Sequence, residues 1–441
     1  MLLLLAQIAS QVLEAANAPP VFRAGAGRAA IDLPAAMFPA ESFTTVHDLL
    51  QARVVLLDNG ANRIALVVID MTSLSNDVID LISQIVSQAA AVAPANVLVS
   101  ASHTFSAPHV PAAQQAASAH ERELMITALS NAVRKACSDA VHGLQAARAG
   151  FGTGLSHVNI NRDLESRDGW YLGANEHGSS DKSVGVIRID SEKGEPIAVL
   201  LNYAVQASIM LESKGPDGGR VVTADLAGAA THYVEQQYGG NVVSMFLVGA
   251  AGDQAPLYAA NRYTIDRNLN VGRIDAGNAG FLLVDLLGER LGAETVRVSE
   301  ATRTTSVTAP LRIVSGSVML PELDSSNSPA ARHATRQYNY VVKGKSPMPY
   351  WIVQIGDIAC VGVQVELASL TGEAIKAQSP FRNTLVMTMV NGAAKYLPDS
   401  GSFDRFTYEA QGARYSKGSA EVATAQIIDQ LKRMHAGMQG R

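Results

Sequence analysis

Cysteine is almost absent from this 441-residue chain, which contains only two. No Cys-x-x-Cys pair occurs, and this argues against a cysteine-based structural zinc site or an iron–sulfur cluster. Cys137 lies in a helical pattern and Cys360 in the strand-like run Ile358–Val361. A disulfide cannot be deduced from two residues, so we expect both cysteines to be small buried hydrophobic side chains.

Aromatic and basic residues are also sparse. Aromatic residues make up 5% of the chain, no run of Lys or Arg stands out, and the formal net charge is −5. Without a basic stripe or a base-stacking surface, nucleic acid and anionic membrane surfaces are poor candidates for partners. The chain is 47% hydrophobic, which is ample for a large core and is compatible with one to three domains.

The sequence lacks an apolar run long enough to span a bilayer as a helix. The N-terminal run Leu2–Ala9 is short and is followed by Ala16-Asn17-Ala18, which has the small-x-small form of a signal-peptidase site, and then by Pro19-Pro20. No positive residues precede the run, and an ordinary N-terminal amphipathic helix is the alternative. We predict that residues 1–18 are a signal peptide and that the protein is periplasmic or secreted.

Strand and helix patterns alternate along the whole chain. Residues 53–57 and 64–69 read as strands around a turn, residues 76–91 as a helix, and residues 97–101 as a strand buried on both faces. These predict a βαβ unit whose second strand leads into His103. Further patterns are a helix that starts at a Ser118/Glu121 capping box, hairpins at 184–203 and 351–363, a strand at 242–248, helices at 276–291 and 367–377, and a strand at 385–390.

No internal repeat or long linker divides the chain. We therefore predict one large α/β domain over residues 19–441, with a mixed sheet and flanking helices, and a boundary near Ala309 as the alternative. The composition of Asp324–Pro329 favours a disordered loop. The segments Trp170–Asp181 and Gly316–Pro347 are expected to be loops that shape a binding pocket.

Polar residues follow directly on several apolar strands. They are His103, Asn202, Gln206, Asp253 and Glu366. Ligands in open α/β sheets gather beyond the carboxyl ends of strands, so these residues together indicate a site at one edge of a sheet. Each one alone is explained equally well by a structural role.

Several segments, in their order along the chain, resemble motifs of one enzyme family. Ser100–His109 resembles "SATHTHSGP", Leu201–Ser208 resembles "NxxxHPT", Thr223–Gly228 matches "SADxxG", Gly249–Pro256 matches "GDxxP", Val365-Glu366 matches "GE", and Asn391–Pro398 with Tyr408-Glu409 follows "NGYxxYxP…YE". The chain thereby resembles the neutral/alkaline non-lysosomal ceramidase family. The resemblance runs from about Gly25 to Tyr415 and covers the catalytic domain alone, without the family's C-terminal immunoglobulin-like domain.

The resemblance implies a zinc site and an amide-cleaving reaction. Family members hold one zinc through histidines, a glutamate and a tyrosine, and the metal activates a water that attacks an amide carbonyl. His103, Glu366 and Tyr396 match ligand positions. Phe105 and Gln206 stand where the family has two histidines, and a phenyl ring cannot ligate zinc while a neutral amide oxygen is a weak ligand. Gln206 or Asp225 would have to complete the shell.

The resemblance and the strand ends together give the remaining candidates. Tyr408 matches a tyrosine that polarises the substrate carbonyl, and Asp253 is a candidate catalytic residue. The candidates for substrate binding, besides Phe105 and Gln206, are Arg162, Asn202 and His47. The structural alternatives are that Asp225 caps a helix, that Asp253 fixes its loop, and that His47 only enters a strand.

Three functions remain open from the sequence. The first is a hydrolase of an amide or related acyl bond, acting on a small-molecule or lipid-like substrate, with zinc as the cofactor that the resemblance implies. The second is a metal-independent acid/base enzyme, for example a lyase, in which Glu366 orients His103. The third is a binding protein that has lost the reaction. Fold-level analogy alone does not choose among them.

Overall fold

The computed structural model describes residues 21–115, 118–265, 271–306, 311–324 and 332–439. A large mixed sheet forms its centre. Its pairs are parallel at both ends, between β10 and β12 and between β4 and β5, and antiparallel in between. The strand order is β12 (Val243–Val248), β10 (Pro196–Tyr203), β9 (Ser183–Ser191), β6 (Gln145–Leu155), β1 (Arg23–Ala30), β3 (Gln51–Asp58), β4 (Arg63–Ile69) and β5 (Val97–Ala101), with β16 (Thr305–Ser306) beside β6.

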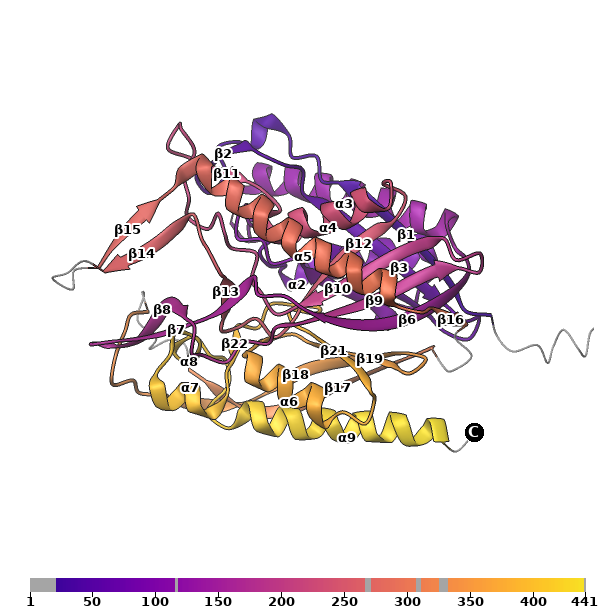
Figure 1. The fold of residues 1–441 in the computed structure, drawn as a ribbon. Coiled ribbons are helices and arrows are strands. Elements are labelled where there is room, and N and C mark those ends of the chain that lie inside the picture. Colours follow the sequence, from indigo (N-terminus) through magenta and orange to yellow (C-terminus); the bar gives the residue numbers. More distant parts are fainter. Residues whose placement is uncertain (1–20, 116–117, 266–270, 307–310, 325–331, 440–441) are drawn as a thin grey trace, which may run out of the picture.

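Four helices cover one face of this sheet (Figure 1). Helices α2 (Asn76–Ala90) and α3 (Ala119–His142) pack on β1, β3 and β5, while α4 (Asp225–Gln237) and α5 (Phe281–Ala301) pack on β9, β12 and β6. Each helix buries an apolar stripe, as amphipathic helices do. Cys137, on the buried stripe of α3, is unpaired and fully buried, as expected from the sequence.

A second sheet lies against the other face. It consists of β17 (Leu311–Leu323), β18 (Val342–Ile355), β19 (Ile358–Val363) and β21 (Asn383–Met387). Leu57 and Leu200 of the large sheet pack in one cluster with Val353 and Cys360 of the small one. Helices α6 (Ser369–Gln378) and α9 (Ser419–Gln439) cover the outer face of the small sheet. The order of layers is helices, sheet, sheet, helices.

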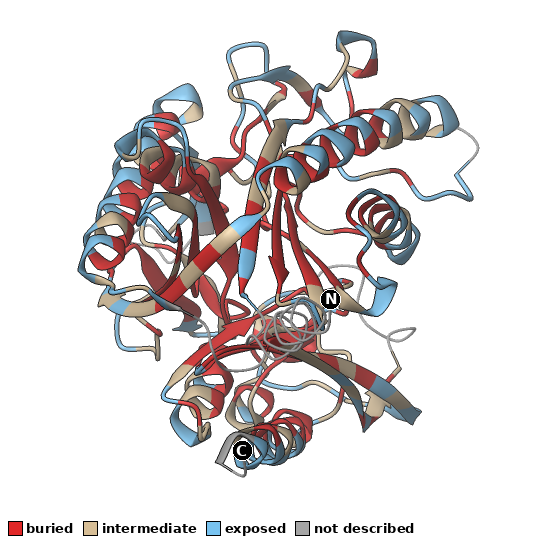
Figure 2. Ribbon diagram, turned by 90° about the vertical axis from the view of Figure 1, so that its right-hand side faces the viewer, coloured by how far each residue is buried: buried red, intermediate tan, exposed pale blue. Residues whose placement is uncertain are grey.

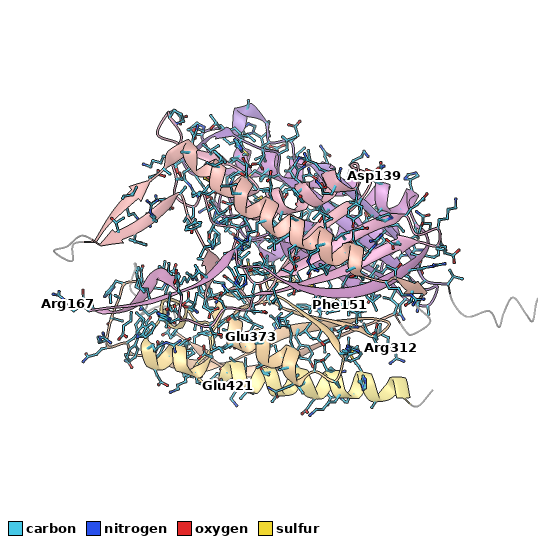
Figure 3. The ribbon with its side chains drawn as sticks, viewed as in Figure 1. Asp139, Phe151, Arg167, Arg312, Glu373 and Glu421 are labelled. Carbon is cyan, nitrogen blue, oxygen red and sulfur yellow. The ribbon has the colours of Figure 1, made fainter. Side chains whose placement is uncertain are left out.

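Burial follows these layers. Figure 2 shows buried residues on both sheets and on the helix faces turned toward them, and exposed residues on the outer helix faces. In Figure 3, Phe151 of β6 lies between the two sheets, whereas Glu421 of α9 lies on the outer side. Apolar area removed from water between two sheets and their helices is the main stabilising contribution to such a fold.

Short elements gather at one end of the layers, on the left in Figure 1. They are β7 (Asn159–Ser166), β8 (Gly169–Asn175), β13 (Gln254–Pro256), β14 (Asn261–Ile265), β15 (Val271–Asp275), β20 (Glu366–Leu367), β22 (Tyr396–Leu397), α7 (Ser400–Arg405) and α8 (Tyr408–Gln411). The strands β2 (Phe43–Val46) and β11 (Arg220–Val222) pair nearby, and 3-10 turns occupy Ala35–Met37, Pro94–Asn96 and Gly277–Gly280. The carboxyl ends of β5, β10, β12 and β19 all lead toward this end.

The predicted fold class is confirmed: the chain is a mixed α/β protein with flanking helices. The βαβ unit, both hairpins and the predicted strands at 53–57 and 242–248 are present within a few residues. The signal peptide predicted at 1–18, the loop at Asp324–Pro329 and the alternative boundary near Ala309 lie wholly or mostly outside the described residues. No helix in the described ranges is both long and apolar enough to cross a membrane.

Three local predictions are wrong. Part of each of the segments Trp170–Asp181 and Gly316–Pro347 is strand rather than loop, namely most of β8 in the first and portions of the paired strands β17 and β18 in the second. The Ser118 side chain makes no cap hydrogen bond at the start of α3. Helix α5 begins at Phe281, after a 3-10 turn, and extends ten residues beyond Leu291.

Candidate active site

His103 lies just beyond the carboxyl end of β5 and is almost fully buried. Its backbone adopts a left-handed conformation, with φ 62°, which is uncommon for a residue other than glycine. The ring Nδ1 lies 2.6 Å from the carbonyl oxygen of Thr72. Because a carbonyl only accepts, Nδ1 carries a proton there, and Nε2 is the nitrogen left to face the site.

Glu366 stands opposite that nitrogen. Its Oε2 lies 3.1 Å from His103 Nε2 and accepts a hydrogen bond of 2.9 Å from the Gln206 amide nitrogen. Burial by itself would raise the pKa of Glu366, but the charge and hydrogen bond of His103, with the nearby Arg162, hold that pKa below its usual value. The Glu366 carboxylate and the His103 ring thus face each other at hydrogen-bond distance.

Gln206 links this pair to a buried arginine. The Gln206 amide oxygen accepts a 2.7 Å hydrogen bond from Arg162 NH1, while Arg162 Nε donates at 2.7 Å to Glu409 Oε1. The orientation of the amide is fixed by its two neighbours, because reversing it would set N–H groups against the guanidinium and oxygen against the carboxylate. A continuous chain therefore runs from Glu409 through Arg162, Gln206 and Glu366 to His103.

A cavity of about 720 Å³ opens beside this chain. Five residues singled out from the sequence line it: Phe105, Arg162, Gln206, Tyr396 and Tyr408. The Phe105 ring lies 4.6 Å from the His103 ring, centre to centre. The cavity thus has polar groups on its floor and an aromatic wall, which is the usual composition of a small-molecule site.

The rings of Tyr396 and Tyr408 line the cavity, and two arginine guanidinium groups lie against them. The guanidinium of Arg332 lies 3.7 Å from the Tyr408 ring centre, and that of Arg162 lies 5.4 Å from it. Arg162 also lies 5.5 Å from the ring centre of Tyr396, which pairs with Glu366 across the β20–β22 ladder. Cation–π contacts of this kind fix the rings and orient the hydroxyl groups.

Carboxylates gather behind Arg162, away from the cavity. Asp253 accepts hydrogen bonds from the Ser369 backbone and the Asn161 side chain, and burial raises its pKa to about 7. Burial and the charge of Glu409 likewise raise the pKa of Asp163. Asp253 therefore lies in a buried acidic cluster rather than in the cavity lining, and its structural role is the one the geometry favours.

Three other candidates lie elsewhere. Asn202 donates both amide hydrogens to the carbonyls of Leu247 and Val386, tying β10 to β12 and β21. His47 is exposed, stacks on Phe281 at 3.6 Å and does not line the cavity. Asp225 is the first residue of α4 and not its N-cap, but its carboxylate accepts from the Leu226 N–H in the first turn of that helix. It also accepts from the backbone N–H groups of Ile209 and Met210 and so anchors the segment after Gln206.

Some residues of the site were missed from the sequence. Glu409, which holds Arg162, stands next to Tyr408 in a matched motif, and this was the available signal. Thr72, whose carbonyl sets the protonation of His103, carried no signal because only its backbone acts. The β14–β15 hairpin, which supplies Arg262, Tyr263 and Arg273 to the cavity, was also missed.

The residues present fit a zinc ion poorly. Across the described part of the chain, no three His, Cys, Asp or Glu side chains come together in a way that could hold a metal. Gln206 turns N–H groups, not its oxygen, toward Glu366. Tyr396 would have to ligate as a phenolate, but burial and the nearby charge of Glu366 raise its pKa far above neutrality. His103 and Glu366 remain as an imidazole and a carboxylate without a third strong donor.

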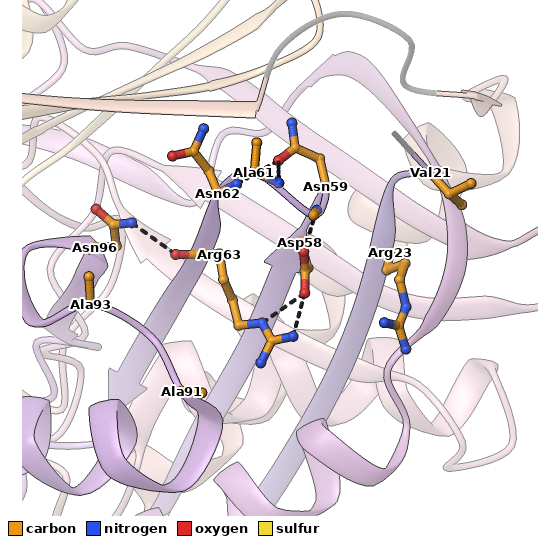
Figure 4. Close-up of a pocket in the computed structure, with 11 residues that line it drawn as sticks. Val21, Arg23, Asp58, Asn59, Ala61, Asn62, Arg63, Ala91, Ala93 and Asn96 are labelled. Carbon is orange, nitrogen blue, oxygen red and sulfur yellow. Dashed lines mark hydrogen bonds and ion pairs between the residues drawn. The ribbon is translucent and has the colours of Figure 1, made fainter. Parts of the chain in front are cut away.

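A second cavity, of about 930 Å³, lies where β3 turns into β4 (Figure 4). Its polar groups bind one another: Asp58 Oδ2 accepts 2.8 Å and 2.5 Å hydrogen bonds from Arg63, and Asp58 Oδ1 accepts from the Gly60 backbone. Asn96 binds the Arg63 carbonyl. Among the residues that the structure describes, no histidine, thiol or tyrosine lines this cavity, so it offers less chemistry despite its greater volume.

Comparison with known proteins agrees with the resemblance seen in the sequence. No family model matches the sequence, and no curated protein matches it. The fold superposes on the crystal structure of neutral ceramidase from Pseudomonas aeruginosa with a TM-score of 0.71 and 16% identity, over 94% of this chain and 75% of that one. A ceramidase in complex with C2 matches with the same score and identity, over 95% of this chain and 76% of its own. The chain therefore has the fold of a neutral ceramidase.

Proposed function

We propose that the cavity beside His103 and Glu366 is the active site of a hydrolase that cleaves an amide or related acyl bond. One observation carries the proposal: Gln206, which lines a cavity of about 720 Å³, donates a hydrogen bond to Glu366 Oε2, and that oxygen lies 3.1 Å from His103 Nε2. A carboxylate and an imidazole in direct contact can accept a proton and return it, which is what hydrolysis of an acyl bond needs.

Glu366 is the general base in this proposal. Both of its hydrogen bonds fall on Oε2, and the carboxyl side chain keeps 13% of its surface exposed. Oε1 then takes a proton from a water molecule as the water oxygen bonds to the acyl carbon. His103, fixed by Thr72, is a positioning residue whose Nε2–H holds the carboxylate in place.

The second half of the reaction returns that proton. When the tetrahedral intermediate collapses, the bond from the acyl carbon to nitrogen breaks and Glu366 protonates the leaving amine. Arg162 and Tyr408 line the cavity, and in this proposal they donate hydrogen bonds to the developing oxyanion. Preorganised donors at that position commonly supply the greatest share of the rate enhancement in acyl-transfer catalysis.

The assignment to amide bonds draws on the two ceramidases with which the fold is shared. Both proteins are named as ceramidases, that is, as ceramide-cleaving enzymes. Because the fold is shared, we propose the same class of reaction for this chain. We also propose that residues 19–441 form the catalytic domain and that residues 1–18 direct export. Zinc stays a prediction from the resemblance, and no step above passes through it.

The proposal is tested by incubating the purified protein with a panel of N-acyl amides and measuring the released amine. We expect turnover that survives chelators and is lost in Glu366→Gln. Elemental mass spectrometry on the untreated protein is the companion measurement. About one zinc per chain, with turnover lost to chelators, would replace this acid–base scheme by the zinc chemistry. Binding of amides without any turnover would leave the ligand-binding alternative.

A further inference from the structure

We infer that the rim of this cavity binds an anionic group. The substrate is then an amide with a carboxylate or phosphate at one end and an apolar chain elsewhere. This inference rests on the proposed function, because it names the substrate class of the same site. Two arginines of the β14–β15 hairpin carry it, Arg262 and Arg273, which both line the cavity.

The position of Arg273 is set by its neighbours. Arg273 lies directly across the antiparallel ladder from Tyr263, and its guanidinium stands 4.5 Å from the Tyr263 ring centre. The Tyr263 ring in turn lies edge-on to the Tyr171 ring of β8, with the two ring centres 6.5 Å apart. A guanidinium held over a ring loses less conformational freedom on binding, which favours pairing with a planar anion.

The charge of the lining is unbalanced. Its charged residues are Arg162, Arg262, Arg273 and Glu176. Arg162 forms an ion pair with Glu409. The charged lining residues that remain are the cations Arg262 and Arg273 and the carboxylate Glu176. Within the ranges that the structure describes, no carboxylate forms an ion pair with Arg262 or Arg273, although the whole chain carries a net charge of −5. A locally cationic cleft in an acidic protein concentrates anions.

Part of the uncharged lining is aliphatic. Ile160, Leu172, Leu211, Leu257 and Leu283 contribute to it. Such a surface favours a hydrocarbon chain, at about 25 cal/mol for each Å² of apolar area that leaves water. A wholly neutral lipid would fill this surface but would give the two arginines no partner. An anionic amide with an apolar chain satisfies both parts, and an N-acylated amino acid is the simplest example.

The test compares three amides with the same acyl chain: N-dodecanoylglycine, N-dodecanoylethanolamine phosphate and the neutral N-dodecanoylglycinamide. We expect wild-type kcat/KM to be at least about tenfold higher for an anionic amide than for the neutral one. The double variant Arg262→Gln/Arg273→Gln should lose this preference, so that kcat/KM for the anionic amides falls about tenfold relative to that for the neutral amide. High salt should reduce the preference in the wild type. Arg134→Gln, at an exposed arginine on α3, is the matched control and should change nothing.

The outcomes separate the inference from the proposed function. Equal turnover of charged and neutral amides by the wild type overturns the inference and leaves the hydrolase proposal intact. Turnover of none of the three counts against the hydrolase, and calorimetric titration with N-dodecanoylglycine then decides the inference. Binding that weakens about tenfold in the double variant supports the anion site, and binding that is unchanged in it overturns the site. A preference for carboxylate over phosphate, or the reverse, identifies the anion.

Discussion

The two cavities of this protein differ in how their polar groups are supplied. The larger one takes its charged pair from a single turn, where Asp58 and Arg63 satisfy each other within five residues of sequence. Beside the smaller one, Gln206 of the lining meets His103 and Glu366, and the three come from segments far apart in the chain. Volume therefore does not identify the site. Converging strand ends bring reactive side chains from distant segments into contact, whereas the charged side chains of a local turn pair with each other.

The two cavities also differ in how much free energy it takes to bury their charged groups. At the smaller cavity, Arg162 and Glu409 are buried charges whose desolvation is offset by their pairing and, for Arg162, by its hydrogen bond to Gln206 and its contacts with two tyrosine rings. In the larger one, Arg63 keeps 30% of its side chain in solvent, so its ion pair contributes little to stability. Because the fold keeps buried charges at the smaller cavity and a partly exposed ion pair at the larger one, we expect its chemistry at the smaller cavity. The predictions below test that contrast at matched positions.

The largest effect is expected from removing the proposed base. Glu366→Gln keeps the shape and one hydrogen-bonding oxygen but cannot accept a proton from water, so kcat should fall about a thousandfold. Asp58→Asn makes the same chemical change at the other cavity and should leave the rate within about twofold. Initial rates of amine release on the best amide measure both. A Glu366→Gln enzyme that retains a tenth of wild-type activity would count against the proposed role.

Restoring imidazoles should create metal affinity at the smaller cavity only. Phe105→His places a second imidazole where the Phe105 ring now lies 4.6 Å from that of His103. We expect zinc to bind about a hundredfold more tightly than in the wild type, because three strong donors replace two. Competition with a chromophoric chelator measures this affinity. Adding His103→Asn should remove the gain, and no gain at all would mean that the segment is oriented differently from that of the ceramidase family.

This contrast also explains which features were predictable. His103, Gln206 and Glu366 were found because an apolar run that ends in a polar residue is a local pattern, and sheet geometry brings such ends together. The bond between Arg162 and Glu409 was missed because it joins residues 247 positions apart, with no local pattern linking them. Asn202 satisfied the same strand-end rule, yet its side chain turns inward because β10 has neighbours on both edges and β21 behind it.

The acidic cluster behind the site should make stability fall as pH rises. Asp253 has a folded pKa raised to about 7, above the value of about 3.9 expected in the unfolded chain. The neutral form is therefore favoured by folding, and this contribution is present at low pH and is lost as pH rises through about 7. Between about pH 5 and about pH 8 the wild type should lose about 2 kcal/mol that Asp253→Asn does not lose. Urea denaturation at both pH values measures the difference, and parallel pH profiles would show that Asp253 is already ionised.

The smallest effect is expected at the larger cavity. In Asp58→Asn, the amide oxygen can still accept from the Gly60 backbone, but an NH₂ group then faces the Arg63 guanidinium in place of the carboxylate oxygen. Arg63 can turn toward solvent and retain its bond to the Ala90 carbonyl, so the free energy of unfolding should fall by only about 1 kcal/mol. The loss should shrink in high salt, because the pair is partly exposed. A loss several times larger, unaffected by salt, would mean that this turn is as tightly constrained as the active site, and the contrast between the two cavities would then rest on reactivity alone.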